Sequence, residues 1–366
     1  MKILFFICLF LISGVQYAQK NWTVQQSNSW YTQQPWLVGC NYVPNNAINE
    51  LEMWQSDTFD SSRIDLELGW AESIGMNTLR VFLHDLLWYQ DAQGFENLLS
   101  QFLAICAKHH IRPMLVLFDS VWDPNPHLGK QREPKPGIHN SGWVQSPGAS
   151  AVRDEKQYPR LESYVKGIVG AFAQDKRVLC WDIWNEPDNL NTNNYTEPKN
   201  KVALIEKLLP KAFNWARVAK PSQPLTSGVW KINYVDFKGL TAIEQIQLIE
   251  SDIITFHDYG DTASFRRSIH FLKQYKRPLI CTEYLARGNK STFETILPLA
   301  KSNHIGMINW GLVVGKTQTN LPWDSWAKPY TNGREPAVWH HEIFYSDGKP
   351  YKQEEVDLIR QLTKGD

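Results

Sequence analysis

Residues 178–187 read VLCWDIWNEP, and this stretch decides how the rest of the chain is interpreted. The run up to Trp184 is almost wholly apolar and rich in branched and aromatic side chains, which is typical of a buried β-strand. It is followed by Asn185 and Glu186, and then by Pro187, which has no backbone N–H to donate to a sheet and therefore ends the strand. A buried strand that delivers a carboxylate at its carboxyl end is thus the first structural prediction.

Seven further runs have this composition and are bounded by Gly, Pro, Asn or Asp. With the first they predict eight strands: Trp36–Tyr42, Thr78–Leu83, Met114–Phe118, Val178–Trp184, Leu225–Val229, Ile253–Phe256, Leu279–Thr282 and Met307–Leu312. Between them, apolar residues recur at helical spacing in 64–74, 95–105, 161–172, 204–215, 265–272 and 356–362. The chain therefore alternates between strands and helices.

Eight strands alternating with helices in one chain of 366 residues predict an α/β protein built as a single (β/α)₈ barrel. A doubly wound open sheet is the alternative, but the Gly-rich turn that this fold uses for phosphates is missing after the first strand. There is no internal repeat or low-complexity linker, so residues 19–366 are predicted to form one domain. The irregular segments Asp119–Pro159 and Trp310–Asp347 are predicted as long loops after strands three and eight, on the catalytic face.

The first 18 residues are predicted to be a signal peptide. Lys2 is followed by an almost wholly apolar run, Ile3–Ile12, and then by small and polar residues, with a plausible cleavage point after Ala18. The run is too short to span a bilayer, and no other stretch is apolar enough to do so. The mature protein is therefore expected to be secreted or periplasmic.

The amino-acid composition argues against some classes of binding partner. The 38 basic and 38 acidic residues balance and are scattered, which argues against a nucleic-acid binder and against an anionic-membrane partner. Aromatic residues are abundant, with 16 Trp, 14 Tyr and 16 Phe, and aromatic rings both build cores and stack on sugar rings. The Cys residues of the mature chain lie in apolar runs without paired spacing, so they are predicted to be buried free thiols. The oligomeric state stays open.

A second strand, within the stretch LICTEY at 279–284, also ends on a carboxylate, Glu283. In a barrel, Glu186 and Glu283 rise from the same rim, on strands four and seven at opposing sides of the mouth. Glycoside hydrolysis needs such a pair, one carboxyl protonated and the other ionised. A separation of about 5–5.5 Å indicates retention and about 6.5–9.5 Å indicates inversion, and the sequence leaves both open.

Three further motifs accompany this pair at predicted strand ends: Arg80 in NTLRVF, His257 and Tyr259 in HDY, and Trp310 in INWG. These motifs, their order along the chain and the Asn-Glu-Pro of strand four resemble those of clan A glycoside hydrolases. The closest resemblance is to glycoside hydrolase family 5. The resemblance covers essentially the whole mature chain.

The resemblance implies a role for each matching residue. Glu186 is expected to be the acid/base and Glu283 the nucleophile, and Asn185 is expected to bind the 2-hydroxyl of the sugar. Arg80 and Tyr259 are expected to hold Glu283 ionised, since an adjacent guanidinium lowers the pKa of a carboxyl group. His257 is expected in the site and Trp310 beneath the sugar. No metal and no organic cofactor is implied.

One departure concerns strand three. Family 5 enzymes usually carry a histidine near its end, where this chain has Asp119, so His84 or His139 is expected to supply similar contacts. Several loop tryptophans are either sugar platforms or loop caps: Trp122, Trp143, Trp323 and Trp326. The adjacent pairs His109-His110 and His340-His341 are interpreted as solvated or packed side chains rather than metal ligands.

These patterns favour a retaining β-glycosidase that acts on a β-linked glycan or oligosaccharide. A transglycosylase with the same residues and a catalytically inactive, carbohydrate-binding barrel are the alternatives. The glycan, its linkage, and endo or exo action stay open, because specificity resides in the loops.

Overall fold

The computed structural model describes residues 20–231 and 239–364, so the predicted signal peptide lies outside the described residues. Eight parallel strands form one sheet with the order β5-β4-β3-β2-β1-β8-β7-β6. They are β1 (Val38–Asn41), β2 (Thr78–Phe82), β3 (Arg112–Asp119), β4 (Cys180–Asn185), β5 (Leu225–Thr226), β6 (Ile254–His257), β7 (Leu279–Glu283) and β8 (Gly306–Trp310). Each of the eight predicted strands is present.

The sheet closes on itself between its two ends, β5 and β6. Val229 and Phe256 form a parallel bridge, and the N–H of His257 donates to the carbonyl oxygen of Val229 at 2.9 Å. Closure removes the exposed edges that an open sheet would present. The (β/α)₈ barrel is confirmed, and the doubly wound alternative is excluded.

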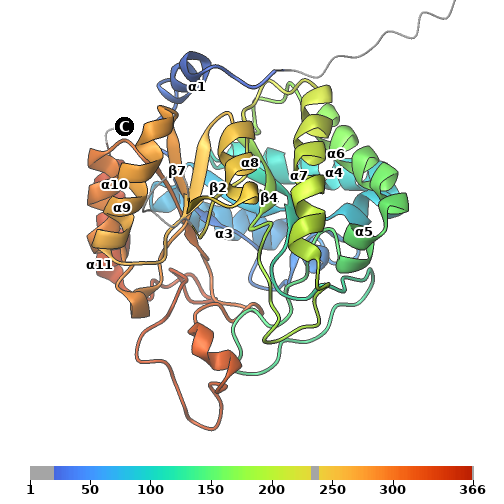
Figure 1. Ribbon diagram of the computed structural model, residues 1–366. Helices are drawn as coiled ribbons and strands as arrows, with labels where there is room; N and C mark the ends of the chain where they lie inside the picture. Colours follow the sequence, from blue (N-terminus) through green and yellow to red (C-terminus); the bar gives the residue numbers. More distant parts are fainter. Residues whose placement is uncertain (1–19, 232–238, 365–366) are drawn as a thin grey trace, which may run out of the picture.

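Helices surround the barrel, as Figure 1 shows. The described helices are α1 (Val24–Tyr31), α2 (Glu50–Trp54), α3 (Ser61–Ser73), α4 (Asp85–Lys108), α5 (Ala149–Arg153), α6 (Tyr158–Ala171), α7 (Lys201–Val218), α8 (Ala242–Glu250), α9 (Thr262–Leu272), α10 (Phe293–Ser302) and α11 (Gln353–Thr363). The six predicted helical stripes fall in α3, α4, α6, α7, α9 and α11. Helices α8 and α10 were not predicted: α8 is short, and Pro298 interrupts the sequence pattern of α10.

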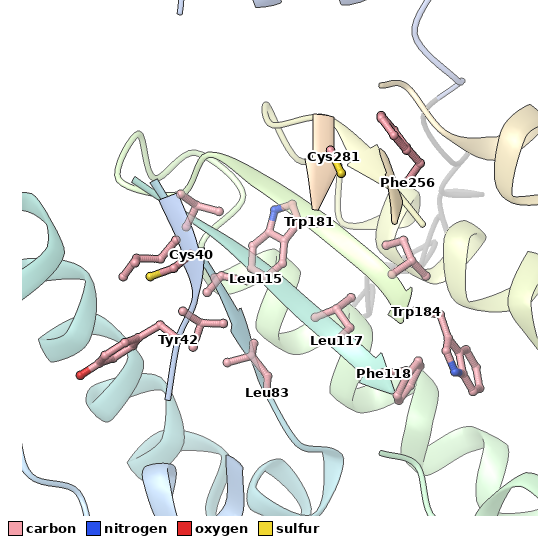
Figure 2. Close-up of a cluster of buried hydrophobic side chains, with 14 of the residues drawn as sticks. Cys40, Tyr42, Leu83, Leu115, Leu117, Phe118, Trp181, Trp184, Phe256 and Cys281 are labelled. Carbon is pink, nitrogen blue, oxygen red and sulfur yellow. The ribbon is translucent and has the colours of Figure 1, made fainter. Parts of the chain in front are cut away.

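The two-residue period of a strand sorts β4 between two environments. Trp181 and Ile183 pack in the main core with helix residues, whereas Cys180 belongs to a smaller cluster with Met114 of the neighbouring strand β3 and Ile280 of β7, on another side of the barrel. Figure 2 shows Trp181 in this buried layer between strands and helices. Asp182, two residues after Cys180 on the same strand, therefore also points into the barrel and brings a charged side chain there.

Trp184 is buried in the barrel wall, as its sequence context predicted. Its ring lies 4.8 Å from that of Phe118, and its indole N–H donates to the hydroxyl of Ser120 at 2.8 Å. Figure 2 shows the two rings side by side near the ends of β3 and β4. Trp184 therefore fixes these two strand ends relative to each other.

Helix α1 covers the amino-terminal end of the barrel. Its sequence is polar and no helix was predicted here, but Thr23 and Gln26 form a capping box that starts it. Trp30 and Tyr31 pack on the cluster that includes Leu37. In Figure 1, α1 lies at the end opposite the long loops.

The long segments after β3 and β8 both lie at the carboxyl end of the strands, at the bottom of Figure 1. The first contains α5, and the second contains the 3-10 turn Trp323–Trp326. The four described cysteines are buried and free, as predicted: Cys40, Cys106, Cys180 and Cys281. None of the helices in the described ranges is long and apolar enough to cross a membrane.

Candidate active site

The carboxyl ends of the strands surround a pocket of about 380 Å³, which is in the range of small-molecule sites. Glu186 follows β4 directly, and Glu283 is the last residue of β7. Six of the predicted site residues line this pocket: Asp119, Asn185, Glu186, Tyr259, Glu283 and Trp310. The sheet order therefore brings together residues that lie far apart in the sequence.

Glu186 has an unusual backbone and an unusual environment. Its φ is 43°, in the left-handed region that side-chain-bearing residues disfavour, and it precedes Pro187, which further restricts it. Its carboxylate accepts a hydrogen bond from Asn189 at 2.5 Å and lies 2.9 Å from Nδ1 of His257. Burial raises the pKa of Glu186 to about 7, although the Asn189 hydrogen bond lowers it. This carboxyl group is therefore able to hold a proton near neutral pH.

Glu283 has two strong partners of its own. Arg80 Nη1 lies 2.8 Å from Oε1, and the Tyr259 hydroxyl donates to Oε2 at 2.8 Å. Burial raises the pKa of Glu283, whereas His257, Arg80 and the Tyr259 hydrogen bond oppose this rise. The full positive charge in direct contact favours an ionised Glu283 over an ionised Glu186.

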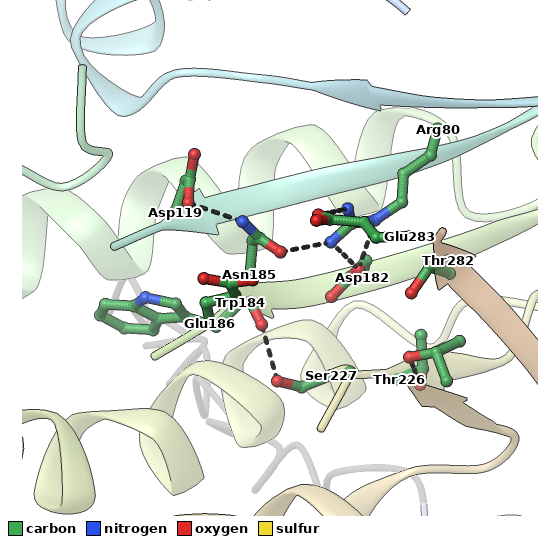
Figure 3. A network of polar contacts seen from close by, with 12 residues as sticks. Arg80, Asp119, Asp182, Trp184, Asn185, Glu186, Thr226, Ser227, Thr282 and Glu283 are labelled. Carbon is green, nitrogen blue, oxygen red and sulfur yellow. Dashed lines mark hydrogen bonds and ion pairs between the residues drawn. The ribbon is translucent and has the colours of Figure 1, made fainter. Parts of the chain in front are cut away.

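Arg80 is fully buried inside the barrel and connects several strands. Its Nε donates to Asp182, the charged residue two positions after Cys180, at 2.9 Å. Its Nη2 donates to the side-chain oxygen of Asn185 at 2.7 Å. Figure 3 shows this network running from Asp119 through Asn185 and Arg80 to Asp182 and Glu283. Arg80 thereby orients both Glu283 and Asn185, the residue next to Glu186.

His257 lies between the two carboxylates. Its Nδ1 is 2.9 Å from Glu186 Oε1 and 3.5 Å from Glu283 Oε2. Burial lowers the pKa of His257 to about 4, so the ring is neutral at neutral pH. Since both neighbours of Nδ1 are carboxylate oxygens, Nδ1 carries the ring proton and donates it. The ring is thus a neutral donor that fixes the spacing of the pair.

One ligand atom from each of Glu186, His257 and Glu283 lies within 4.8 Å of the other two, a spacing that a metal ion could use. The chemistry of the set does not favour an ion, because the guanidinium of Arg80 already contacts Glu283 at 2.8 Å and supplies the positive charge. The expectation of a metal-free site stays a prediction.

Asp119, at the end of β3, lies where family 5 usually has its histidine. It accepts hydrogen bonds from Asn185 at 2.8 Å and from the indole N–H of Trp143 at 2.7 Å. Burial raises the pKa of Asp119 to about 7. Asp119 therefore orients Asn185 from the side opposite Arg80.

The two histidines expected to replace the missing one differ in position. His84 lies outside the pocket: it precedes α4, where its Nδ1 accepts from the backbone N–H of Leu86 at 3.1 Å. The expectation for His84 is therefore corrected, because helix capping uses its ring. His139 does line the pocket, and so do Trp122, Trp143 and Trp323. Trp326 stacks on Trp122 behind them, with ring centroids 5.0 Å apart.

Other pocket residues were not predicted: Val121, Asn140, Asn189, Leu190, Asn191, Asn193, Asn194, Trp230 and His341. Asn189 had a local signal, since it follows Glu186 by one turn. Trp230 lies after β5, and its indole N–H donates to Asp188 at 2.6 Å. His341 had been interpreted only as a packed side chain, and it is both packed and pocket-lining.

No protein-family model matches the chain, and a search of curated proteins found no match. Solved structures do match over most of the chain. GH5_18 from Streptomyces cattleya, in complex with GlcNAc, matches with a TM-score of 0.59 and 11% identity, covering 90% of this chain and 80% of that one. The endo-1,4-β-D-mannanase of Thermotoga petrophila matches with a TM-score of 0.56 and 14% identity, covering 90% and 99%.

An exo-β-1,4-mannosidase from Opitutaceae bacterium strain TAV5 matches with a TM-score of 0.58 and 19% identity, over 90% of this chain and 60% of that one. At these identities the matches establish a shared fold. The chain therefore shares its (β/α)₈ barrel fold with these glycoside hydrolases.

Proposed function

We propose that the protein is a retaining β-glycosidase in which Glu186 is the acid/base and Glu283 the nucleophile. The observation that carries the proposal is the pair itself: two buried carboxylates, with oxygen atoms within 4.8 Å of each other, in unequal surroundings. Glu186 has a pKa of about 7, whereas Glu283 contacts Arg80 directly. Retaining glycosidases need this division between a proton donor and an ionised nucleophile.

In the first step, Glu283 attacks the anomeric carbon and forms a glycosyl ester. The bond from that carbon to the leaving oxygen breaks, and the proton of Glu186 moves to this oxygen. In the second step, Glu186, now ionised, accepts a proton from water, whose oxygen attacks the anomeric carbon and releases Glu283. Two inversions give net retention.

The short distance between the two carboxylates favours retention over inversion. An inverting enzyme needs about 6.5–9.5 Å between the carboxyl groups so that a water molecule fits between sugar and base. The carboxylate oxygens of Glu186 and Glu283 lie within 4.8 Å of each other, which leaves no room for a water molecule between Glu283 and the sugar. Glu283 would therefore contact the sugar ring directly. A direct covalent route therefore fits the site better than attack by an activated water.

The substrate class follows from the site and the neighbours. The pocket combines Trp122, Trp143, Trp310 and Trp323 with polar side chains, as expected for a sugar ring with apolar faces and polar edges. Similar structures are named as a mannanase and a mannosidase, so β-mannosides are the first candidates in a panel of β-glycosides. The apolar segment Ile3–Ile12 supports the further proposal that the protein acts after export.

The experiment is a comparison of Glu283→Ala and Glu186→Ala with wild type on activated aryl β-glycosides. Glu283→Ala is expected to be nearly inactive and to give the inverted glycosyl azide when azide is added. Glu186→Ala is expected to form the ester but to hydrolyse it slowly, and azide then gives a product of retained configuration. Glu294→Ala, on the exposed face of α10, is the matched control.

Undiminished turnover in either active-site variant contradicts the assignment. Glycan binding without turnover in wild type would favour the inactive barrel. Products that carry an added sugar acceptor in preference to water would favour a transglycosylase.

A further inference from the structure

The two long loops after β3 and β8 join each other across part of the barrel mouth. Hydrogen bonds connect them at three places: Asn140 N to Thr317 O (2.7 Å), Tyr330 N to Gly137 O (2.8 Å) and His139 N to Ser325 Oγ (3.0 Å). The side chain of Gln318 adds two more, from its amide to the carbonyl oxygens of Lys135 and Ile138. These backbone and side-chain hydrogen bonds fix the two loops to each other.

Aromatic contacts strengthen this junction next to the pocket. The ring planes of Trp122, in the first loop, and Trp326, in the second, differ by only 15°. The ring of Tyr259, which contacts Glu283, packs edge-on against Trp323 at 5.1 Å. The junction is therefore continuous with the pocket wall.

Both loops are also attached to the segment after β1. The N–H of Lys316 donates to the carbonyl oxygen of Asn45 at 2.9 Å, and the side chain of Asn49 donates to the carbonyl oxygen of Gly142 at 2.9 Å. Strands β2 and β1 lie between β3 and β8 in the sheet. The half of the mouth over these four strands is therefore covered by a continuous wall made of the three segments.

The opposite side of the pocket is formed by the segments after β4 and β5, which contribute Leu190, Asn193, Asn194 and Trp230. Glu186 protonates the leaving oxygen, so the departing part of the substrate must lie beside it. Glu186 itself begins the segment after β4. The departing part therefore leaves on this side, and the ring that Glu283 attacks faces the wall.

Two histidines of this wall, His139 and His341, each present Nε2 as a hydrogen-bond acceptor. Nδ1 of His139 lies 2.7 Å from the carbonyl oxygen of Leu321, and Nδ1 of His341 contacts that of Leu285. A carbonyl oxygen only accepts, so each Nδ1 carries the proton and each Nε2 is an acceptor. Among the described residues neither Nε2 has a protein partner, and both rings line the pocket. Burial lowers the pKa of His139 to about 3 and that of His341 well below its usual value, so both rings stay neutral.

We propose that the joined loops close one end of the pocket, so that it accepts the non-reducing terminal residue of a neutral β-glycan. This proposal rests on the glycosidase function above. His139 and His341 accept hydrogen bonds from hydroxyl groups of that residue, including one that is substituted in every internal residue. The enzyme is therefore exo-acting and releases one sugar residue at a time. A chain that continued past the attacked ring would meet the wall.

The first experiment follows the products from β-oligosaccharides labelled at the reducing end. The expected first products are the free monosaccharide and a labelled chain shorter by one residue, with little fall in the viscosity of the polysaccharide. A disaccharide or internal fragments as first products would overturn the inference, while the glycosidase function would stand. Failure to cleave any aryl glycoside or glycan would instead count against the glycosidase function itself.

The second experiment tests His139 with His139→Phe and His139→Gln. Phe keeps a ring without the acceptor, whereas the amide oxygen of Gln can take the place of Nε2. His139→Phe is expected to lower kcat/KM on the order of tenfold, mainly through KM, and His139→Gln to restore most of it. The control is His270→Phe, on the exposed face of α9.

Aryl glycosides that lack single hydroxyl groups separate recognition from structure. For the analogue without the recognised hydroxyl, wild type and His139→Phe are expected to have similar kcat/KM. Equal losses on the intact sugar and on all analogues would show a structural role and would overturn this part of the inference. Thermal unfolding of each variant checks that it is folded, and the product analysis of wild type does not depend on the variants.

Discussion

The side-chain amide of Asn189 donates a hydrogen bond at 2.5 Å to Oε2 of Glu186, three residues earlier in the chain and across the turn that follows β4. The two residues belong to the same turn after β4, so one segment of backbone positions both side chains. The contact stabilises the ionised form of Glu186, against the burial that raises its pKa to about 7. Asn189 therefore sets the pH at which the proposed acid loses its proton.

The first prediction is a shift of the pH profile in Asn189→Ala. In the proposed mechanism activity requires protonated Glu186, so kcat/KM is expected to fall as pH rises through its pKa of about 7. Without the hydrogen bond the pKa rises further, and the alkaline limb moves to higher pH. The measurement is kcat/KM against pH on a glycoside with a poor leaving group, with Asn97→Ala on the surface of α4 as control. An alkaline limb that stays in place or moves to lower pH contradicts the role.

The second prediction concerns His257, whose N–H faces both carboxylates. In His257→Leu both carboxyl groups lose a donor that favours their ionised forms, so both pKa values rise. The acid limb, set by Glu283, and the alkaline limb, set by Glu186, are expected to move to higher pH together. His257→Asn keeps an N–H close to the position of Nδ1 and is expected to keep more of the wild-type profile. If only the height of the profile changed, His257 would act on activity without acting on the two pKa values.

Much of the barrel was predictable from the sequence because its signals are local. Each strand is a short apolar run, and strands β3, β4, β6, β7 and β8 each end on or next to a polar or aromatic site residue. Once the order of strands is known, parallel geometry alone brings these ends to one rim. The pairing of Arg80 with Glu283, in contrast, was expected from the resemblance to family 5 glycoside hydrolases and not from the strand pattern alone.

The features that the sequence did not predict depend on contacts between segments that are distant in the chain. Trp122 and Trp326 lie in two different loops and stack on each other, and no sequence pattern predicts this contact. His84 was expected near the site, but its position directly before α4 makes it a helix cap. Helix α1 was not predicted because its residues are mostly polar: its buried residue is Ser27, and Trp30 and Tyr31 pack partly buried against the barrel. The closed end of the pocket could therefore be seen only in three dimensions.

The third prediction concerns the stability contributed by the buried charge network. Arg80→Met leaves Asp182 and Glu283 buried without their cation, and breaking a buried pair in this way costs about 3–5 kcal/mol of the free energy of unfolding. Urea unfolding of the variant measures this cost. Adding Asp182→Asn is expected to recover part of it, since one unpaired charge is removed. Lys108→Met, which breaks the exposed contact with Asp65, is expected to cost about 0–1 kcal/mol.

The fourth prediction is a loss of stability, caused by Glu342, as the pH rises from 4.5 to 8. This carboxyl group is buried behind the active-site wall, where Thr319 donates to Oε1 and no described residue pairs with Oε2. Burial raises the pKa of Glu342 from 4.5 to about 8. The folded protein therefore keeps a proton there that the unfolded chain has already released.

The sign of the effect follows from this difference in bound protons. Below pH 4.5 both states are protonated and the stabilising contribution is complete. Between 4.5 and 8 only the folded state holds the proton, so the free energy of unfolding falls by at most about 1.4 kcal/mol per pH unit. Above pH 8 both states are ionised and the loss is complete.

Glu342→Gln keeps the shape of the side chain and removes the titration. Its stability relative to wild type is expected to increase steadily between pH 4.5 and 8 and to level off above that range. Thermal or urea unfolding at a series of pH values measures this difference, and Glu294→Gln on the surface of α10 is expected to follow wild type. A difference between Glu342→Gln and wild type that does not change with pH would mean that Glu342 is ionised in the folded protein, with its charge compensated inside the wall.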